Sequence, residues 1–164
     1  MRGPRVVLSP LSPDDVGVLR EIRREPEVAR WWGRLEDDFP FGDDPDATRF
    51  AIRVDEDVVG LIQFGEEPEP EYRHAWIDLF VATARQGEGL GTEAIGVLLG
   101  HLEGERGHHR VTIDPALDNA AAIRSYEKAG FVPVGVTRRS WRDPEGVWRD
   151  SLFMERVTPA PGPR

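Results

Sequence analysis

The chain has 164 residues, which fits one domain with a hydrophobic core, and it contains no cysteine, so disulfides, a reactive thiol and thiolate metal sites are excluded. The formal net charge of −9 argues against a nucleic-acid partner, which needs a basic surface, and favours a cationic small molecule. No apolar run reaches the roughly 18 residues that a membrane span needs, so we expect no membrane association and a cytoplasmic location.

The first part of the chain predicts a strand, two helices and a hairpin. Apolar residues at helical spacing and runs of β-favouring residues place these elements at 6–10, 12–25, 26–33, 48–54 and 58–65. An acidic segment, 34–47, separates the second helix from the hairpin. It contains prolines and a glycine, and its length is typical of loops that contribute to binding sites.

The second part alternates strands with helices and ends in another hairpin. We expect strands at 74–82 and 109–115, a helix after residue 89, a helix at 118–130, and paired strands at 131–141 and 147–157. A second acidic loop spans 66–72. The order is β-α-α-β-β-β-α-β-α-β-β, one mixed α/β domain over 1–157, followed by a Pro-rich tail at 158–164 that we expect to be disordered.

The segment "QGEGLG" (86–91) follows a predicted strand and opens a predicted helix. Glycines let the backbone approach a ligand closely, and a helix N-terminus attracts phosphate. The phosphate loop of nucleotide hydrolases is excluded, because no Lys-Ser/Thr pair follows the glycines. The dinucleotide fingerprint fits poorly, because the spacing is Gly-x-Gly-x-Gly and the loop lies midway along the chain.

A third pattern fits: Gln86, Gly89 and Gly91 match Gln/Arg-x-x-Gly-x-Gly/Ala. Downstream, "IDPALDNAAAIRSYEKAGF" (113–131) combines a strand, an Asn-containing loop and a helix. The two segments together resemble the GCN5-related N-acetyltransferases over roughly residues 5 to 157. This resemblance implies a mixed, mostly antiparallel sheet that splays between its fourth and fifth strands and is flanked by about four helices.

The resemblance also implies acetyl-coenzyme A as the acyl donor and direct attack by an amine on its thioester. Donor binding is implied for Val81, Gln86, Gly87, Glu88, Gly89, Leu90, Gly91, Thr92 and Asn119. For Arg124, a phosphate contact and a solvated position are equally compatible with the sequence. A backbone N–H near Leu79 to Val81 would polarise the thioester carbonyl, and Tyr126 would protonate the leaving thiolate.

Asp78 is a lone carboxylate within the apolar strand "AWIDLFVA". A buried carboxylate without a partner is costly, so we expect Asp78 either to line a cavity that receives a cationic amine or to be held by an arginine or by backbone donors. Asp114, at the end of the next strand, is a second candidate. Its alternative is a simple turn residue before Pro115.

The segments "WID", "GEGLGTEAI" and "VARWWG" (28–33) narrow the resemblance to the aminoglycoside 6′-N-acetyltransferases. That branch implies that Trp31 and Trp32 line the acceptor cleft, that Asp78 binds and deprotonates the 6′-amine, and that Asp114 is a second anchor. The acidic loops would then attract the cationic substrate. Alternatively, the two tryptophans are core residues.

Other acceptors and one non-enzymatic role stay open. Siderophore-pathway lysine acyltransferases and N-terminal acetyltransferases of ribosomal proteins share the "NxxAIRxYEKxGF" pattern, so the acceptor is alternatively a lysine derivative or a peptide amine. A coenzyme A-binding module without catalysis is the third reading. No metal is expected, because His108 and His109 have no third ligand and such pairs are usually exposed. The sequence does not distinguish a monomer from a homodimer.

Overall fold

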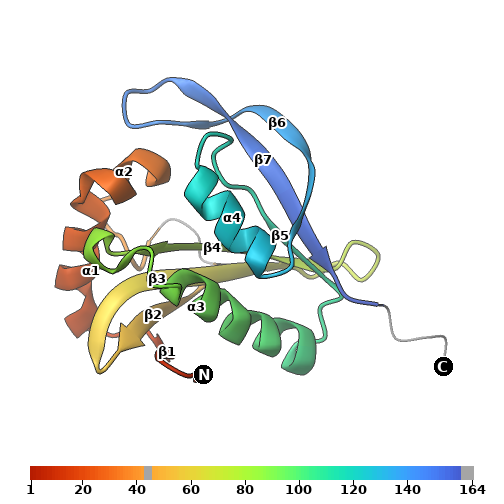
Figure 1. Cartoon of the computed structure of the whole chain (residues 1–164), viewed down its shortest axis with the longest axis horizontal. Coiled ribbons are helices and arrows are strands. Elements are labelled where there is room, and N and C mark those ends of the chain that lie inside the picture. The colour runs from red at the N-terminus through yellow and green to blue at the C-terminus, as the bar shows by residue number, and fades with distance from the viewer. Residues whose placement is uncertain (43–45, 160–164) are drawn as a thin grey trace.

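The computed structural model describes residues 1–42 and 46–159, and its seven strands form one sheet in the order β1-β2-β3-β4-β5-β7-β6 (Figure 1). The strands are β1 Val6–Pro10, β2 Thr48–Val54, β3 Asp57–Glu67, β4 His74–Val81, β5 Arg110–Ile113, β6 Val132–Arg142 and β7 Trp148–Val157. The α-helices are α1 Val16–Arg24, α2 Pro26–Trp32, α3 Leu90–Leu99 and α4 Ala120–Lys128; the π-helix η3 Gly100–Glu105 continues α3, and short 3-10 helices lie at Pro13–Asp15 and Thr83–Arg85. This confirms the predicted fold class; residues 160–164 of the expected tail lie outside the described residues.

The sheet is antiparallel except between β4 and β5, which run parallel. Only two residue pairs join β4 and β5, Ala75 with Val111 and Trp76 with Thr112. Beyond Trp76 the two strands diverge, which confirms the predicted splay between the fourth and fifth strands. The β5-facing edge of residues 77–81 is therefore left without a neighbouring strand.

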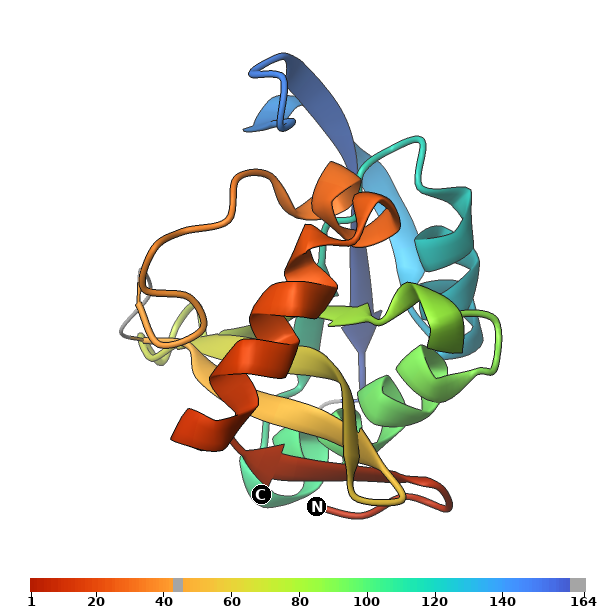
Figure 2. The ribbon, with the colours of Figure 1, turned by 90° about the vertical axis from the view of Figure 1, so that its left-hand side faces the viewer.

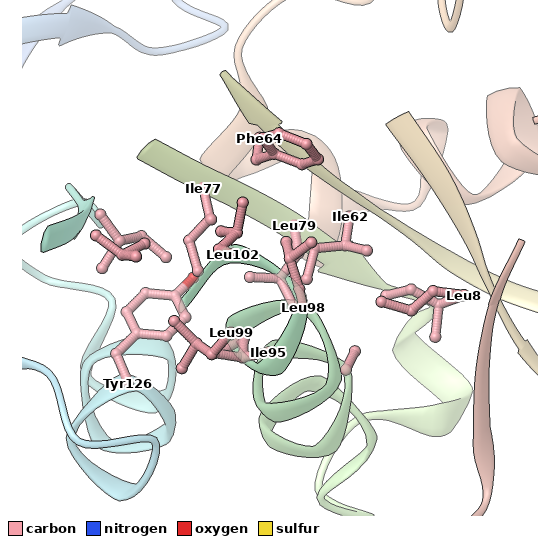
Figure 3. Close-up of a cluster of buried hydrophobic side chains, with 14 of the residues drawn as sticks. Leu8, Ile62, Phe64, Ile77, Leu79, Ile95, Leu98, Leu99, Leu102 and Tyr126 are labelled. Carbon is pink, nitrogen blue, oxygen red and sulfur yellow. The ribbon is translucent and has the colours of Figure 1, made fainter. Parts of the chain in front are cut away.

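The helices cover the two faces of the sheet separately. Leu79 belongs to the larger hydrophobic cluster, which includes the buried side of α3 and Tyr126 of α4 (Figure 3). Phe80 belongs to a second cluster with residues of α1 and α2, which cross the other face of the sheet (Figure 2). Successive side chains of a strand point to opposite faces, so Asp78 projects toward the α1–α2 side with Phe80.

The histidine pair corrects one expectation. His109 is exposed, but His108 is only 2% exposed, and its Nε2 lies 2.5 Å from Oε1 of Glu66. Arg106 pairs with the same carboxylate. His108 is buried because the turn before β5 lies against the end of β3, where Glu66 supplies a partner. Among residues 1–42 and 46–159, no group of three or more metal-ligating side chains is arranged to hold an ion.

Candidate active site

A cleft of about 650 Å³ opens where β4 and β5 separate. The residues that were singled out individually as site candidates line this cleft, except Glu88 and Arg124, whereas no described residue of the acidic segments 34–47 and 66–72 lines it. The lining comes from α2, β4, the glycine loop, the start of α3, the turn after β5, α4 and the β6–β7 hairpin. The splay therefore brings together segments that are far apart in the sequence.

The glycine loop has the backbone conformation that its composition predicts. Gly87 and Gly89 have φ angles of 80° and 81°, in the left-handed region that side chains with a Cβ rarely adopt. Gly89 is the N-cap of α3, which begins at Leu90. A turn of this kind, followed by the positive end of a helix dipole, is typical of a backbone site for an anion.

Two of the candidate acetyl-coenzyme A-binding residues, Glu88 and Arg124, lie outside the cleft lining. Glu88 accepts hydrogen bonds of 2.9 and 3.2 Å from the guanidinium of Arg85, which itself lines the cleft. The hydrogen bond from Arg85 lowers the pKa of Glu88 and keeps it ionised. Arg124 lies on the exposed side of α4. Of the two alternatives for Arg124, the structure shows the exposed position.

The open edge of β4 offers three backbone groups that already have partners. The N–H of Leu79 donates to Oδ1 of Asp78 at 2.9 Å, and the carbonyl oxygen of Leu79 accepts from Nε1 of Trp32 at 3.3 Å. The carbonyl oxygen of Val81 accepts from Nε2 of Gln86 at 3.0 Å. Ala82 donates in the opposite direction, to Val59 of β3. Because backbone groups alternate along a strand, the N–H of Val81 faces the splay.

Asp78 combines both arrangements that the sequence left open, since it lines the cleft and is also held by a backbone donor. Burial raises its pKa to about 7, and the nearby charge of Asp114 acts in the same direction. The N–H of Leu79 and the guanidinium of Arg23 oppose this rise. Asp114 is exposed at the cleft mouth by its surface area, and partial desolvation of its carboxylate there raises its pKa. At neutral pH Asp78 therefore exchanges between its acid and base forms, as a general base requires.

Tyr126 reaches the same cleft from α4. Its side chain is 7% exposed, and its hydroxyl points toward β4 beside Ile77 (Figure 3). Burial, followed by the charges of Asp78 and Asp114, raises the pKa of Tyr126 and keeps the phenol protonated. The hydroxyl is therefore available as a hydrogen-bond and proton donor at the splay.

Asn119 forms the N-cap of α4, and its Oδ1 accepts from the N–H of Ala122 at 3.2 Å. This cap orients the side chain within the cleft lining and leaves its amide N–H groups free of that role. The capping role of Asn119 and a ligand contact through its amide N–H groups are therefore compatible.

The two adjacent tryptophans differ in their surroundings. The ring of Trp32 meets Phe80 edge-on with 4.9 Å between centroids, and its indole N–H is bound to β4. Trp31 lies under the guanidinium of Arg30, 4.4 Å from the ring centroid. Both line the cleft, but Trp32 also belongs to the packed core of the α1–α2 face. Trp32 is therefore both a residue of the cleft wall and a residue of the hydrophobic core.

Trp141 and Arg142 line the cleft from β6, and the sequence analysis did not single them out. The hairpin that contains them was predicted, but its sequence has no motif that indicates a binding site. Its position over the cleft results from the pairing of β7 with β5. A second unexpected residue is Arg23, which the helical spacing of α1 did not distinguish from surface arginines; it is only 3% exposed.

The arrangement of a splayed sheet, a glycine loop at a helix N-terminus and a helix bearing a buried tyrosine defines a class of acyl-transferring domain. A scan against family models matches the Acetyltransferase (GNAT) family over residues 16–131. The chain therefore belongs to this family and is an N-acetyltransferase of the GNAT type, with acetyl-coenzyme A as its acyl donor.

Two curated relatives of the chain share less than 30% sequence identity with it over more than half of their length. The chain is 27% identical over 105 residues to the probable N-acetyltransferase YjcK of Bacillus subtilis, covering 64% of this chain and 58% of YjcK. It is 28% identical over 149 residues to an aminoglycoside N(6′)-acetyltransferase type 1 of Klebsiella pneumoniae, covering 77% of this chain and 73% of that protein. The solved complex of AAC(6′)-Ib with paromomycin and acetyl-coenzyme A has the same fold, with a TM-score of 0.72, 23% identity and 93% of each chain covered. Among the described residues no helix is long and apolar enough to cross a membrane.

Proposed function

We propose that this enzyme transfers an acetyl group from acetyl-coenzyme A to a primary amine of a cationic small molecule, specifically the 6′-amine of an aminoglycoside. The observation that carries the proposal is that Asp78 lines the splay cleft together with the glycine loop and Trp31. A carboxylate suits an ammonium group, and an aromatic face suits the apolar face of a sugar. The similarity to an aminoglycoside N(6′)-acetyltransferase supports this acceptor.

On the donor side, the backbone of the glycine loop and Arg85 hold the pyrophosphate, and Asn119 binds the pantetheine arm. The thioester carbonyl is polarised by a backbone N–H of the open β4 edge. The N–H of Leu79 is already bound to Asp78, whereas that of Val81 faces the cleft. We therefore assign the polarising role to Val81 and the orientation of Asp78 to Leu79.

On the acceptor side, Asp78 accepts a proton from the substrate ammonium, and the neutral amine attacks the thioester carbon. The C–N bond forms, the C–S bond breaks, and the hydroxyl of Tyr126 donates its proton to the departing thiolate. The proton that the attacking nitrogen then loses restores the phenol. Asp114 contributes a second anionic group for the remaining ammonium groups of the acceptor.

The test is release of free coenzyme A thiol in the presence of a panel of amines. We expect turnover with aminoglycosides that carry a 6′-amine and none with matched aminoglycosides that carry a 6′-hydroxyl. Mass spectrometry then locates the added acetyl group. Turnover restricted to lysine derivatives or peptides would replace the acceptor in this proposal, and coenzyme A binding without turnover on any amine would contradict catalysis altogether.

A further inference from the structure

Arg23 is a buried cation in α1, on the same face of the sheet as Asp78. Its residue surface is 3% exposed, and among the described residues its Nε and Nη1 atoms have no hydrogen-bond partner. Burying a charge without a nearby counter-charge is costly, so the position of Arg23 requires an explanation. Its neighbours provide one.

Two aromatic rings, Trp32 and Phe39, contact the guanidinium, and Phe80 packs against both of them; we call these three rings the aromatic box. The guanidinium carbon lies 5.3 Å from the ring centroid of Trp32 and 5.5 Å from that of Phe39. Phe80 contacts both of these rings, with centroid distances of 4.9 and 6.2 Å. Cation–π contacts of this kind stabilise a desolvated guanidinium.

The same side chain also ties the cleft wall to α1. Nη2 of Arg23 donates to the carbonyl oxygens of Trp32 at 3.1 Å and Arg34 at 3.4 Å. Trp32 in turn donates to Leu79, whose N–H holds Asp78. One short chain of contacts therefore connects the buried cation to the strand that carries the candidate base.

The charges around Asp78 come from several elements. Asp114, after β5, and Arg23 of α1 act on Asp78 with opposite signs, and the charges of Asp78 and Asp114 in turn act on the neutral phenol of Tyr126 on α4. Glu36, in the loop after α2, faces Arg23. Burial lowers the pKa of Arg23, and the charges of Asp78 and Glu36 raise it. Among the described groups that influence Asp78, Arg23 is the cation that favours its ionised form.

We propose that Arg23 is a positioning residue that acts on Asp78 in two ways: it supplies a fixed positive charge from within the aromatic box, and it holds the Trp32 wall against β4. The inference rests on the proposed function in one respect, the role of Asp78 as the base. The charge is shielded from salt by burial, so its effect persists at high ionic strength. Arg23 is not part of the cleft lining, so it would act on the base and not on the substrate directly.

The chain offers a matched control one helical turn away. Nη1 of Arg20 donates to the carbonyl oxygens of Glu36, Asp37 and Phe39, at 3.1, 3.1 and 2.9 Å. Arg20 therefore holds the same loop as Arg23, but it is not among the charges that influence the pKa of Asp78. A purely structural role for Arg23 predicts similar effects for Arg20→Gln and Arg23→Gln.

The experiment measures the pH dependence of kcat/KM for both variants, because this ratio reports groups of the free enzyme. For Arg23→Gln we expect the acid limb to move up by roughly one pH unit, so that kcat/KM falls about five-fold at pH 7 and less than about two-fold at pH 9. For Arg20→Gln we expect the limb to stay at its wild-type position. Arg23→Lys retains the charge and should restore the wild-type limb.

A second readout does not require turnover. The carboxyl carbon of Asp78, assigned by its disappearance in Asp78→Asn, is titrated by 13C NMR in each variant. A shifted midpoint in Arg23→Gln alone supports the inference, even if no amine is acetylated and the proposed function fails. An unshifted midpoint, or an equal shift in Arg20→Gln, overturns it and leaves the proposed function standing. If Arg23→Gln does not fold, the Asp78 titration in Arg23→Lys tests the inference instead. A midpoint that moves although the positive charge is retained would also contradict it.

Discussion

The indole N–H of Trp32 donates to the carbonyl oxygen of Leu79 at 3.3 Å and so joins the end of α2 to the open edge of β4. Leu79 has no strand partner on that side, because β5 has already diverged. A side chain from α2 therefore replaces part of a missing strand. The adjacent N–H of Leu79 fixes Asp78, so the position of the candidate base depends on this substitute contact.

Removing this contact should weaken both acceptor binding and the stability of the fold. In Trp32→Phe the ring remains for packing against Phe80 but the donor is lost, and we expect a loss of about 1 kcal/mol of stability and a several-fold rise in the acceptor KM. Thermal melts and steady-state kinetics provide the measurements. Trp31→Phe is the comparison, because the indole of Trp31 has no hydrogen bond to any residue within 1–42 and 46–159; equal effects on stability would contradict the anchoring role of Trp32.

Replacing Asp78 tests its chemistry. Asp78→Asn retains the shape and an acceptor oxygen for the N–H of Leu79 but removes the base, so we expect turnover to fall about 10²- to 10⁴-fold with coenzyme A affinity within about two-fold of wild type. Turnover is followed by thiol release and affinity by calorimetry. Asp114→Asn should mainly raise the acceptor KM. Equal losses of turnover and donor affinity in Asp78→Asn would show that Asp78 is structural.

Asp78 also predicts a pH dependence of stability. Its pKa is about 7 in the folded chain and near 4 when unfolded, so the native state binds the extra proton between these values. Ionisation therefore removes stability as pH rises from about 4 to 7. Above pH 7 we expect the free energy of unfolding of Asp78→Asn to exceed that of the wild type by about 1–3 kcal/mol, allowing for solvent in the cleft. This difference should disappear near pH 4. Denaturant titrations at pH 4.5 and pH 8 measure the difference, and a gap that does not change between the two would argue against a raised pKa.

The glycine loop offers a matched pair of substitutions. Gly89→Ala places a Cβ at a φ of 81°, so we expect a loss of about 1 kcal/mol and clearly weaker coenzyme A binding. Gly96→Ala lies within α3, where a Cβ meets no atom within 4 Å, and should raise stability by about 0.5–1 kcal/mol without changing affinity. Calorimetric binding of coenzyme A and thermal melts compare the two. Normal affinity in Gly89→Ala would exclude a role for this backbone conformation.

The variant Tyr126→Phe measures the contribution of the Tyr126 hydroxyl to catalysis. Because the phenol lies in a buried position with a raised pKa, Tyr126→Phe should leave the fold intact and lower kcat by about 10- to 100-fold. Single-turnover measurements of thiol release follow the chemical step. An unchanged rate of that step would assign protonation of the thiolate to another group.

The order of the elements, the presence of a glycine loop at a helix N-terminus and the family could all be predicted from the sequence alone. These are local properties: the periodicity of apolar residues selects helix or strand, Gly87 and Gly89 are the residues that tolerate positive φ, and the segment 113–131 is contiguous. The position of Asp78 in an apolar strand was enough to mark it as a candidate. No spacing rule indicated its pKa, because that value depends on burial and on charges from other elements.

Which side chains meet at the splay could be seen only from the packed fold. It showed that Trp32 is anchored to β4 whereas Trp31 is not, and that Glu88 and Arg124 lie outside the cleft lining. It also showed that Arg23, one of several arginines in α1, is buried within the aromatic box. Burial and electrostatic coupling depend on packing between elements remote in the chain, and such packing leaves no periodic pattern in the sequence.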